Sequence, residues 1–207
     1  LDAATGEAVY PAITNATLTV LSPDARWLAV ARLDHSVSLI GVDDGQVVAE
    51  IAGHTDRILA LAFSAESDRL VTGSADRTAR VWRIPSGEPE GSALEHDEPV
   101  IRAAFRPGGR QVATAEHFQG DRAVLGRVSL WDVARGSQSR VTKQIEGGVE
   151  SDGTVWALFF EPAPDSRFFV GIRNAVHVWD ADSFAEVLPP LKMGSVARSW
   201  AFSPDGA

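Results

Sequence analysis

Short runs in which bulky apolar residues alternate with small or polar ones recur along the whole 207-residue chain. The clearest set lies in Gly53–Trp82, with the sequence GHTDRILALAFSAESDRLVTGSADRTARVW. Ile58–Phe63 alternates large and small side chains, and Arg69–Ser74 and Thr78–Trp82 follow after short polar turns. Alternation with a period of two predicts β-strands, so this stretch predicts three strands in succession. No segment shows capped helical periodicity, and we therefore expect no helices.

The strand pattern repeats at a nearly constant interval. The residues just before each Ser-Pro-Asp-like turn are Leu21, Phe63, Phe105, Phe160 and Phe202, at spacings of 42, 42, 55 and 42 residues. The position of Trp82 is filled in the other repeats by Leu1, Ile40, Trp131 and Trp179, with a similar period. The longer interval is explained by two insertions, in Glu116–Gly126 and Ser137–Gly153, which fall between strands where extra length is tolerated. Two independent markers with one period predict a repeat architecture.

A fourth strand is expected in each repeat after a glycine-containing hairpin turn. Such turns occur at Thr5-Gly6, Asp44-Gly45, Ser86-Gly87 and Arg135-Gly136. Four short strands every 40-odd residues predict small sheets arranged as blades around an axis.

The residues at the repeat markers resemble those of the WD40 repeat family of β-propellers. The resemblance is carried by Gly53-His54, Phe63-Ser64, Thr72-Gly73-Ser74, Asp76, Trp131-Asp132 and Trp179-Asp180. It implies an all-β, WD40-type propeller in one segment over residues 1–207, with about four full repeats at 14–54, 55–96, 97–153 and 154–195. Partial blades are expected at both ends, at residues 1–13 and 196–207. Since such propellers usually close with about seven blades, we expect a fragment of a larger propeller, with the missing blades supplied in cis.

The resemblance also implies a structural tetrad formed by His54, Thr72, Asp76 and Trp82. In it Asp accepts from the His ring, His contacts the Thr hydroxyl, and that hydroxyl meets the Trp N–H. Read without the resemblance, the Asp, His and Thr residue types could form a nucleophilic triad, but no oxyanion-hole motif accompanies them. The structural interpretation is therefore favoured.

The other repeats depart from this tetrad. The first keeps Asp34 but has Val30 and Ile40 at the Thr and Trp positions. The third keeps His96, Thr114 and Trp131 and has Leu125 where Asp is expected, and the fourth keeps only Trp179. Apolar packing is therefore expected to supply most of the stability of the blades.

The resemblance further implies a partner-binding rim, on the face that carries the loops before the first strands and between the second and third. The residues expected there are Asp56, Arg57, Arg77, Glu98, Arg102, Trp156 and Arg198. Trp156 is the preferred anchor, because Leu59 and Ile101 take its place in neighbouring repeats and Trp and Arg are frequent interface anchors. Packing of Trp156 between blades is the open alternative.

Composition excludes several classes of site. The chain has no cysteine, which excludes disulfides and thiolate metal sites, and its net charge of −9 opposes nucleic-acid binding. No apolar run is long enough for a transmembrane helix, so no membrane association is expected. Glu116, His117 and Asp121 could suggest a metal, but their spacing fits no known site and a solvated loop is the preferred interpretation. No catalytic, cofactor-binding or metal-binding residue is predicted.

These observations predict a non-catalytic protein–protein interaction scaffold or sensor module of a larger multidomain protein, bacterial in character and cytoplasmic. Its partner is expected to be a protein or peptide. The alternatives are a propeller enzyme of hydrolase or dehydrogenase type with a central-channel site, for which Asp56 and Glu98 would be candidates, and a purely structural spacer.

Overall fold

The computed structural model of the chain describes residues 13–117, 124–135, 141–146, 155–161, 167–172 and 175–192. All regular elements among these residues are β-strands, which confirms the all-β prediction. Nowhere in these ranges is there a helix that is long and apolar enough to cross a membrane. Except for Ile13, the partial blades predicted at residues 1–13 and 196–207 lie outside the described residues.

The strands form four antiparallel sheets of four strands each, which we call blades 1 to 4 in chain order. Blade 1 contains β1 (Ala16–Leu21), β2 (Trp27–Arg32), β3 (Val37–Gly41) and β4 (Val47–Ile51). Blade 2 contains β5 (Ile58–Phe63), β6 (Arg69–Ser74), β7 (Thr78–Arg83) and β8 (Leu94–Glu95). Blade 3 contains β9 (Val100–Phe105), β10 (Gln111–His117), β11 (Val124–Asp132) and β12 (Val141–Glu146). Blade 4 contains β13 (Val155–Phe160), β14 (Arg167–Ile172), β15 (Ala175–Asp180) and β16 (Glu186–Lys192).

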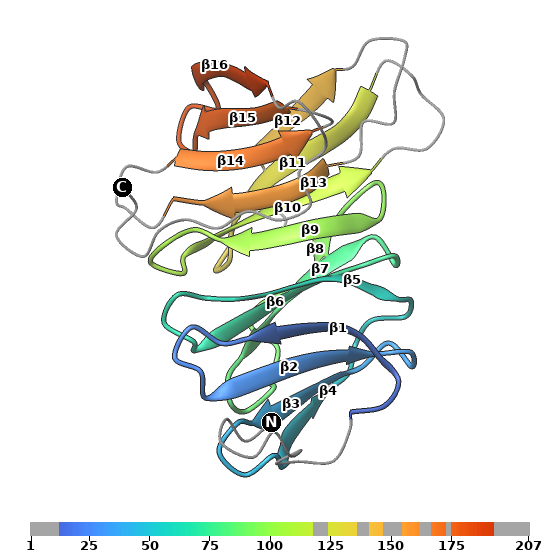
Figure 1. Ribbon diagram of the computed structural model, residues 1–207. Coiled ribbons are helices and arrows are strands. Elements are labelled where there is room, and N and C mark those ends of the chain that lie inside the picture. Colours follow the sequence, from blue (N-terminus) through green and yellow to red (C-terminus); the bar gives the residue numbers. More distant parts are fainter. Residues whose placement is uncertain are drawn as a thin grey trace.

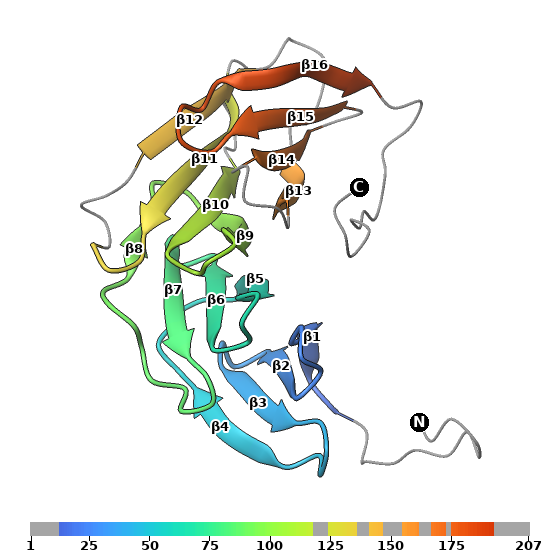
Figure 2. The same ribbon diagram turned by 90° about the vertical axis from the view of Figure 1, so that its left-hand side faces the viewer.

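The blades follow one another along an arc (Figure 1 and Figure 2). Their first strands, β1, β5, β9 and β13, lie next to one another on the inner side of the arc. The fourth strands of blades 1, 3 and 4 lie on the outer side in Figure 2. Within each sheet the strands pair in chain order, so every blade is a simple meander. This arrangement confirms the predicted propeller class.

The core lies between the blades. Leu39 of blade 1 packs in one cluster with Leu70 and Trp82 of blade 2. Blade 2 meets blade 3 through small clusters that include Val71 and Val112. The cluster between blades 3 and 4 is rich in aromatic rings. Since the two faces of a strand point to different neighbours, the middle strands of blades 2 and 3, which have a neighbouring blade on each side, are almost entirely buried.

Gly73 permits the close approach of blades 2 and 3. A Cβ atom built on Gly73 would lie 2.7 Å from a methyl carbon of Val100 and 3.1 Å from its backbone oxygen. Any larger residue would therefore push β6 and β9 apart. The same residue belongs to the Thr-Gly-Ser segment that the sequence identifies as a repeat marker.

The two ends of the sheets differ. The loops that precede the first strands and the turns between second and third strands share one end, which we call the loop face. Backbone hydrogen bonds from Ala75 N to Arg57 O and from His96 N to Arg77 O hold these loops together. The opposite end carries the turns between first and second strands and is called the turn face. There Ala25, Ser67 and Gly109, each 42 residues apart, all have positive φ angles.

Blade 2 departs from the predicted pattern at its fourth strand. The sequence predicts a strand directly after the turn at Ser86-Gly87, but β8 is only two residues long and begins at Leu94. Pro89 forms a single isolated bridge with Trp82, and Gly91 has a φ of +77°. Proline lacks the N–H that a ladder needs and a positive φ leaves the extended region, so the strand is interrupted between them.

Candidate functional site

The four residues of the predicted tetrad lie together in blade 2 as one hydrogen-bonded chain. Trp82 Nε1 donates to the Thr72 hydroxyl at 2.9 Å, and that hydroxyl lies 2.7 Å from His54 Nε2. His54 Nδ1 lies 2.8 Å from an oxygen of Asp76. These hydrogen bonds connect the loop before β5, strands β6 and β7, and the turn between them. It therefore ties the loop face of blade 2 to its core.

The turn residue Asp76 is held by more than His54. Its carboxylate also accepts from the backbone N–H of Thr55 at 3.0 Å and from the hydroxyl of Thr78 at 2.8 Å. Burial tends to raise the pKa of Asp76, but these hydrogen bonds outweigh it and the pKa lies below the ordinary value. Burial lowers the pKa of His54, against the opposing effect of Asp76. The favoured state is an ionised Asp76 beside a neutral imidazole.

The Asp–His–Thr cluster is closed to a substrate. Thr72 has no exposed surface, and the side chain of His54 is only 2% exposed. The Thr72 hydroxyl accepts from the indole N–H of Trp82 and lies against the imidazole, so its hydrogen-bonding capacity is used within the blade. This geometry stabilises the blade and presents no nucleophile to solvent.

Blade 3 contains a similar chain with a different acceptor. Trp131 Nε1 donates to the Thr114 hydroxyl at 2.8 Å, and that hydroxyl lies 2.8 Å from His96 Nε2. His96 Nδ1 lies 2.7 Å from the backbone oxygen of Leu94. A backbone carbonyl therefore occupies the place that Asp76 has in blade 2.

Glu116 is a residue that the sequence interpretation missed. It was expected in a solvated insertion loop, but it lies in β10 and is completely buried. Its Oε1 accepts from the backbone N–H groups of Asp97 and Glu98 at 2.8 and 3.1 Å. In blade 2, Asp76 binds the backbone N–H of Thr55, 42 residues before Asp97. Glu116 thus binds the loop before the first strand of blade 3, as Asp76 binds the corresponding loop of blade 2. Its position two residues after Thr114 is the sequence feature from which this contact could have been predicted.

An arginine completes this arrangement. Arg127 of β11 lies 3.7 Å from the Glu116 carboxylate and also contacts the carboxylate of Asp97. The Arg127 side chain is 14% exposed, so the ion pair is largely shielded from water. The metal alternative drawn from Glu116, His117 and Asp121 gains no support here. No three His, Asp or Glu residues in the described ranges lie close enough to hold an ion, and Asp121 lies outside those ranges.

Blades 1 and 4 contain only parts of the tetrad. Asp34 accepts from the backbone N–H and the hydroxyl of Ser36, as Asp76 does from Thr78. In blade 4, Trp179 packs edge-on against the ring of Phe168 at 5.4 Å between ring centres. His177 pairs with Glu186 at 2.9 Å on the partly exposed side of β15. Aromatic packing thus accompanies Trp179 in the blade that lacks the Thr and Asp residues.

The structure brings several predicted rim residues to the loop face. Asp56, Arg57 and Arg77 are exposed there in blade 2, and Glu98 is partly exposed in blade 3. Arg102 differs, because it lies within β9, is partly buried, and donates to the backbone oxygen of Ile101 at 2.7 Å. Burial lowers its pKa.

Two further residues of the predicted rim, Trp156 and Arg198, cannot be assigned to the loop face by their side chains. The backbone of Trp156 belongs to β13, but its side chain lies outside what the structure describes. Arg198 lies outside the described residues altogether.

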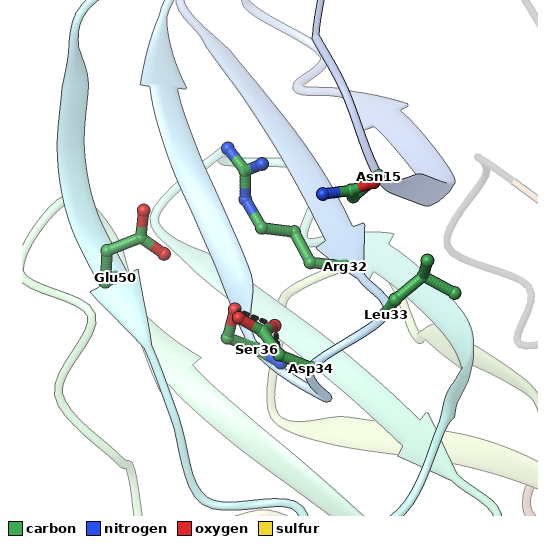
Figure 3. Close-up of a pocket in the computed structure, with 6 residues that line it drawn as sticks. All are labelled: Asn15, Arg32, Leu33, Asp34, Ser36 and Glu50. Carbon is green, nitrogen blue, oxygen red and sulfur yellow. Dashed lines mark hydrogen bonds between the residues drawn. The ribbon is translucent and has the colours of Figure 1, made fainter.

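Two hollows adjoin the rim on blade 1 and share Arg32 and Leu33. The first, which we call the blade 1 hollow, has a volume of about 580 Å³ and is lined by Asn15, Arg32, Leu33, Asp34, Ser36 and Glu50. Figure 3 shows Arg32, Glu50 and the hydrogen-bonded pair of Asp34 and Ser36 around it. Arg32 donates to Ser38, which in turn contacts Glu50 at 2.9 Å. The polar groups of this hollow are therefore largely engaged with one another.

The second, which we call the rim hollow, lies between blades 1 and 2 and has a volume of about 290 Å³. Its lining residues are Thr17, Leu18, Arg32, Leu33, Arg57, Ile58 and Leu59. Apolar side chains make up most of this lining, with Arg57 from the predicted rim at its edge. Sequence reasoning identified Arg57 and missed Leu33, which stands where blade 2 has Ala75.

The arc of four-stranded sheets, together with buried His–Thr–Trp chains, defines a β-propeller. Comparison with known proteins specifies the class. Residues 45–83 match the family model of the WD domain, G-beta repeat. The chain therefore contains a WD40 repeat and is similar to WD40-repeat proteins, as its repeat markers predict.

Relatives are similar over part of their length. An uncharacterised WD repeat-containing protein of Synechocystis is 34% identical over 118 residues, which are 55% of this chain and 34% of that protein. The periodic tryptophan protein 2 homolog of Neurospora crassa is 29% identical over 119 residues, 57% of this chain and 12% of that protein. The chain thus spans about a third or less of the length of these relatives.

A solved structure supports the fold. The β-propeller domain of Cps50 (Swd1) from Myceliophteria thermophila superimposes with a TM-score of 0.75 at 16% identity. The match covers 95% of this chain and 61% of that domain. At this identity the likeness concerns the fold alone.

Proposed function

We propose that this chain is a non-catalytic protein-interaction scaffold or sensor module within a larger multidomain protein. The observation that carries the proposal is the loop face of blades 1 and 2. There an apolar hollow opens beside exposed charged side chains, at positions where the repeats differ from one another. Interfaces combine such an apolar centre with a charged edge.

The buried tetrad supports the non-catalytic part of the proposal. The Asp–His–Thr group that most resembles catalytic machinery is enclosed within blade 2, and its hydroxyl is held by Trp82. In addition, the chain covers only a part of each WD40 relative, which is consistent with a module of a longer protein.

The test is affinity capture from cells of the native source with a tagged chain, followed by mass spectrometry. The rim variant combines Arg57→Glu, Arg77→Glu and Glu98→Lys, all exposed or partly exposed on the loop face. The matched control is Arg26→Glu, an exposed arginine on the turn face. We expect a partner that the unmodified chain and the control enrich and that the rim variant loses. Equal enrichment by all three, or no enriched protein, would refute the proposal.

A further inference from the structure

Leu33 is the most exposed of the large apolar side chains in the described part of the protein, with 62% of its surface accessible. It lies at the start of the turn between β2 and β3, on the loop face. A single exposed leucine is ordinary on a protein surface. Leu33 is different because it forms the wall of the rim hollow, together with Leu18, Ile58 and Leu59.

The two arginines that line this hollow differ in whether their guanidinium groups already have partners within the protein. Arg32 is engaged, because its guanidinium donates to Ser38 and to the backbone oxygen of Thr14. The guanidinium of Arg57 makes no hydrogen bond or ion pair within the described residues, and the same is true of Arg77 in the adjacent turn. Of the two arginines that line the apolar hollow, Arg57 is therefore the one whose guanidinium is available to a ligand.

The size of the hollow restricts what it can hold. Sites for drug-sized ligands and cofactors usually measure about 300–1,000 Å³, and the rim hollow, at about 290 Å³, lies at the lower limit of that range. One branched aliphatic side chain with its neighbouring backbone fits such a space. An isolated anion would gain little there, because most of the lining is apolar.

We propose that the rim hollow binds a peptide segment of a partner protein that presents an aliphatic side chain close to a carboxylate. The aliphatic group packs against Leu18, Leu33 and Leu59, and the carboxylate pairs with Arg57. This inference rests on the proposed interaction function and gives the chemistry of its partner.

The overall charge of the chain favours such a peptide over a polyanion. At −9 the protein repels nucleic acids and anionic surfaces at long range. A single carboxylate is repelled less, because it carries one charge where a polyanion carries many, and Arg57 attracts it from within the screening length of about 8 Å at physiological salt.

Fluorescence anisotropy with labelled synthetic peptides tests the proposal. Each probe carries one Leu and one Glu in an otherwise neutral polar peptide, in both orders and at increasing separation. Matched peptides replace Glu by Gln or Leu by Ser. The comparison probes are a single-stranded oligothymidylate and vesicles that contain phosphatidylserine. All are measured against the full chain and its folded variants, with circular dichroism as the check on folding.

We expect saturable binding of at least one Leu–Glu peptide, and weaker binding by about tenfold in Leu33→Ala and in Arg57→Gln. Two controls should bind as the unmodified chain does. Leu21→Ala removes a leucine that is 52% exposed, and Arg26→Gln removes an exposed arginine of the turn face. Raising the salt concentration should weaken the binding of the Leu–Glu peptide and leave the binding of the Leu–Gln peptide unchanged.

Three results would overturn the inference: no saturable peptide binding, binding by Leu33→Ala and Arg57→Gln as tight as by the unmodified chain, or preference for the oligonucleotide or the vesicles. These failures are distinct from failure of the interaction function. If affinity capture yields a rim-dependent partner while the peptides do not bind, the scaffold function stands and the peptide chemistry assigned to the hollow is wrong.

Discussion

His96 Nδ1 lies 2.7 Å from the backbone oxygen of Leu94, whereas the same nitrogen of His54 lies 2.8 Å from the carboxylate of Asp76. A carbonyl oxygen can only accept, so His96 carries its proton on Nδ1. The ionised Asp76 imposes the same tautomer on His54. Blades 2 and 3 therefore share one hydrogen-bond direction from Trp through Thr to His, while the acceptor behind the histidine differs in charge.

Replacing Asp76 by Ala tests how much the carboxylate contributes. The substitution leaves the Nδ1–H of a buried imidazole and the N–H of Thr55 without their acceptor. We expect the free energy of unfolding to fall by about 1–3 kcal/mol, measured by urea denaturation. Asp34→Ala is the matched control, since Asp34 occupies the same turn position and its carboxylate is bound by Ser36. An equal loss in both variants would assign the effect to the turn alone.

Acidification should destabilise the protein in two stages. The pKa of His54 is lowered by burial from its ordinary value of 6.5, so between the two values the unfolded chain binds a proton that the folded chain does not. Stability should therefore decrease as the pH falls below about 6.5. The pKa of Asp76 is also lowered, because hydrogen bonds from Thr55, Thr78 and His54 outweigh its burial. Its contribution is lost only at lower pH, below its ordinary value of 3.8.

The measurement is a series of urea denaturations between about pH 7 and pH 5, the window in which an unperturbed histidine titrates. His54→Gln should flatten the pH dependence in this window, whereas His35→Gln makes the same change outside the tetrad and should retain it. An unmodified protein whose stability does not vary across the window would contradict the assignment of a neutral His54.

Glu116→Ala should be among the most harmful substitutions in blade 3. It removes the acceptor of two backbone N–H groups and leaves the shielded Arg127 without this partner. We expect a loss of about 3 kcal/mol in urea denaturation. In the Arg127→Met background the loss from Glu116→Ala should be smaller, because no cation then remains beside the vacated site. Equal losses in both backgrounds would show that the ion pair contributes nothing.

The repeat period explains why the fold could be predicted and parts of the site could not. Leu21, Phe63 and Phe105 are spaced by strand and turn lengths that hardly vary, so the period defines where sheets begin. The positions of His54, Thr72, Asp76 and Trp82 follow from the same register, and the structure brings the four residues together.

The repeat register does not predict the groups that replace a missing tetrad residue, because these groups stand at other positions of the repeat. Glu116 binds the loop from a strand position that holds Ser74 in blade 2, and Leu94 contributes a backbone oxygen that no sequence pattern identifies. Leu33 was also missed, since its importance depends on the hollow that Leu18 and Leu59 form across two blades.

Phe184 provides a prediction from backbone conformation. It lies five residues after Trp179, as Gly87 lies five residues after Trp82, and both have positive φ angles of 55° and 73°. A bulky residue in this region is strained, and only glycine adopts it freely. Phe184 remains there because its ring is buried and packs against Phe168 at 5.5 Å between ring centres.

Both Phe184→Ala and Phe184→Gly remove the ring, but only Phe184→Gly relieves the backbone strain of the positive φ angle. We therefore expect Phe184→Gly to be the more stable variant by about 1 kcal/mol, the reverse of the usual order of Ala and Gly within strands. Thermal and urea denaturation of the two variants measure the difference. Ala25, with a φ of 59° and no buried ring, serves as the control, and Ala25→Gly should leave stability unchanged or raised. If Phe184→Ala were the more stable of the pair, the turn of blade 4 would not impose the positive φ, and ring packing alone would explain the position of Phe184.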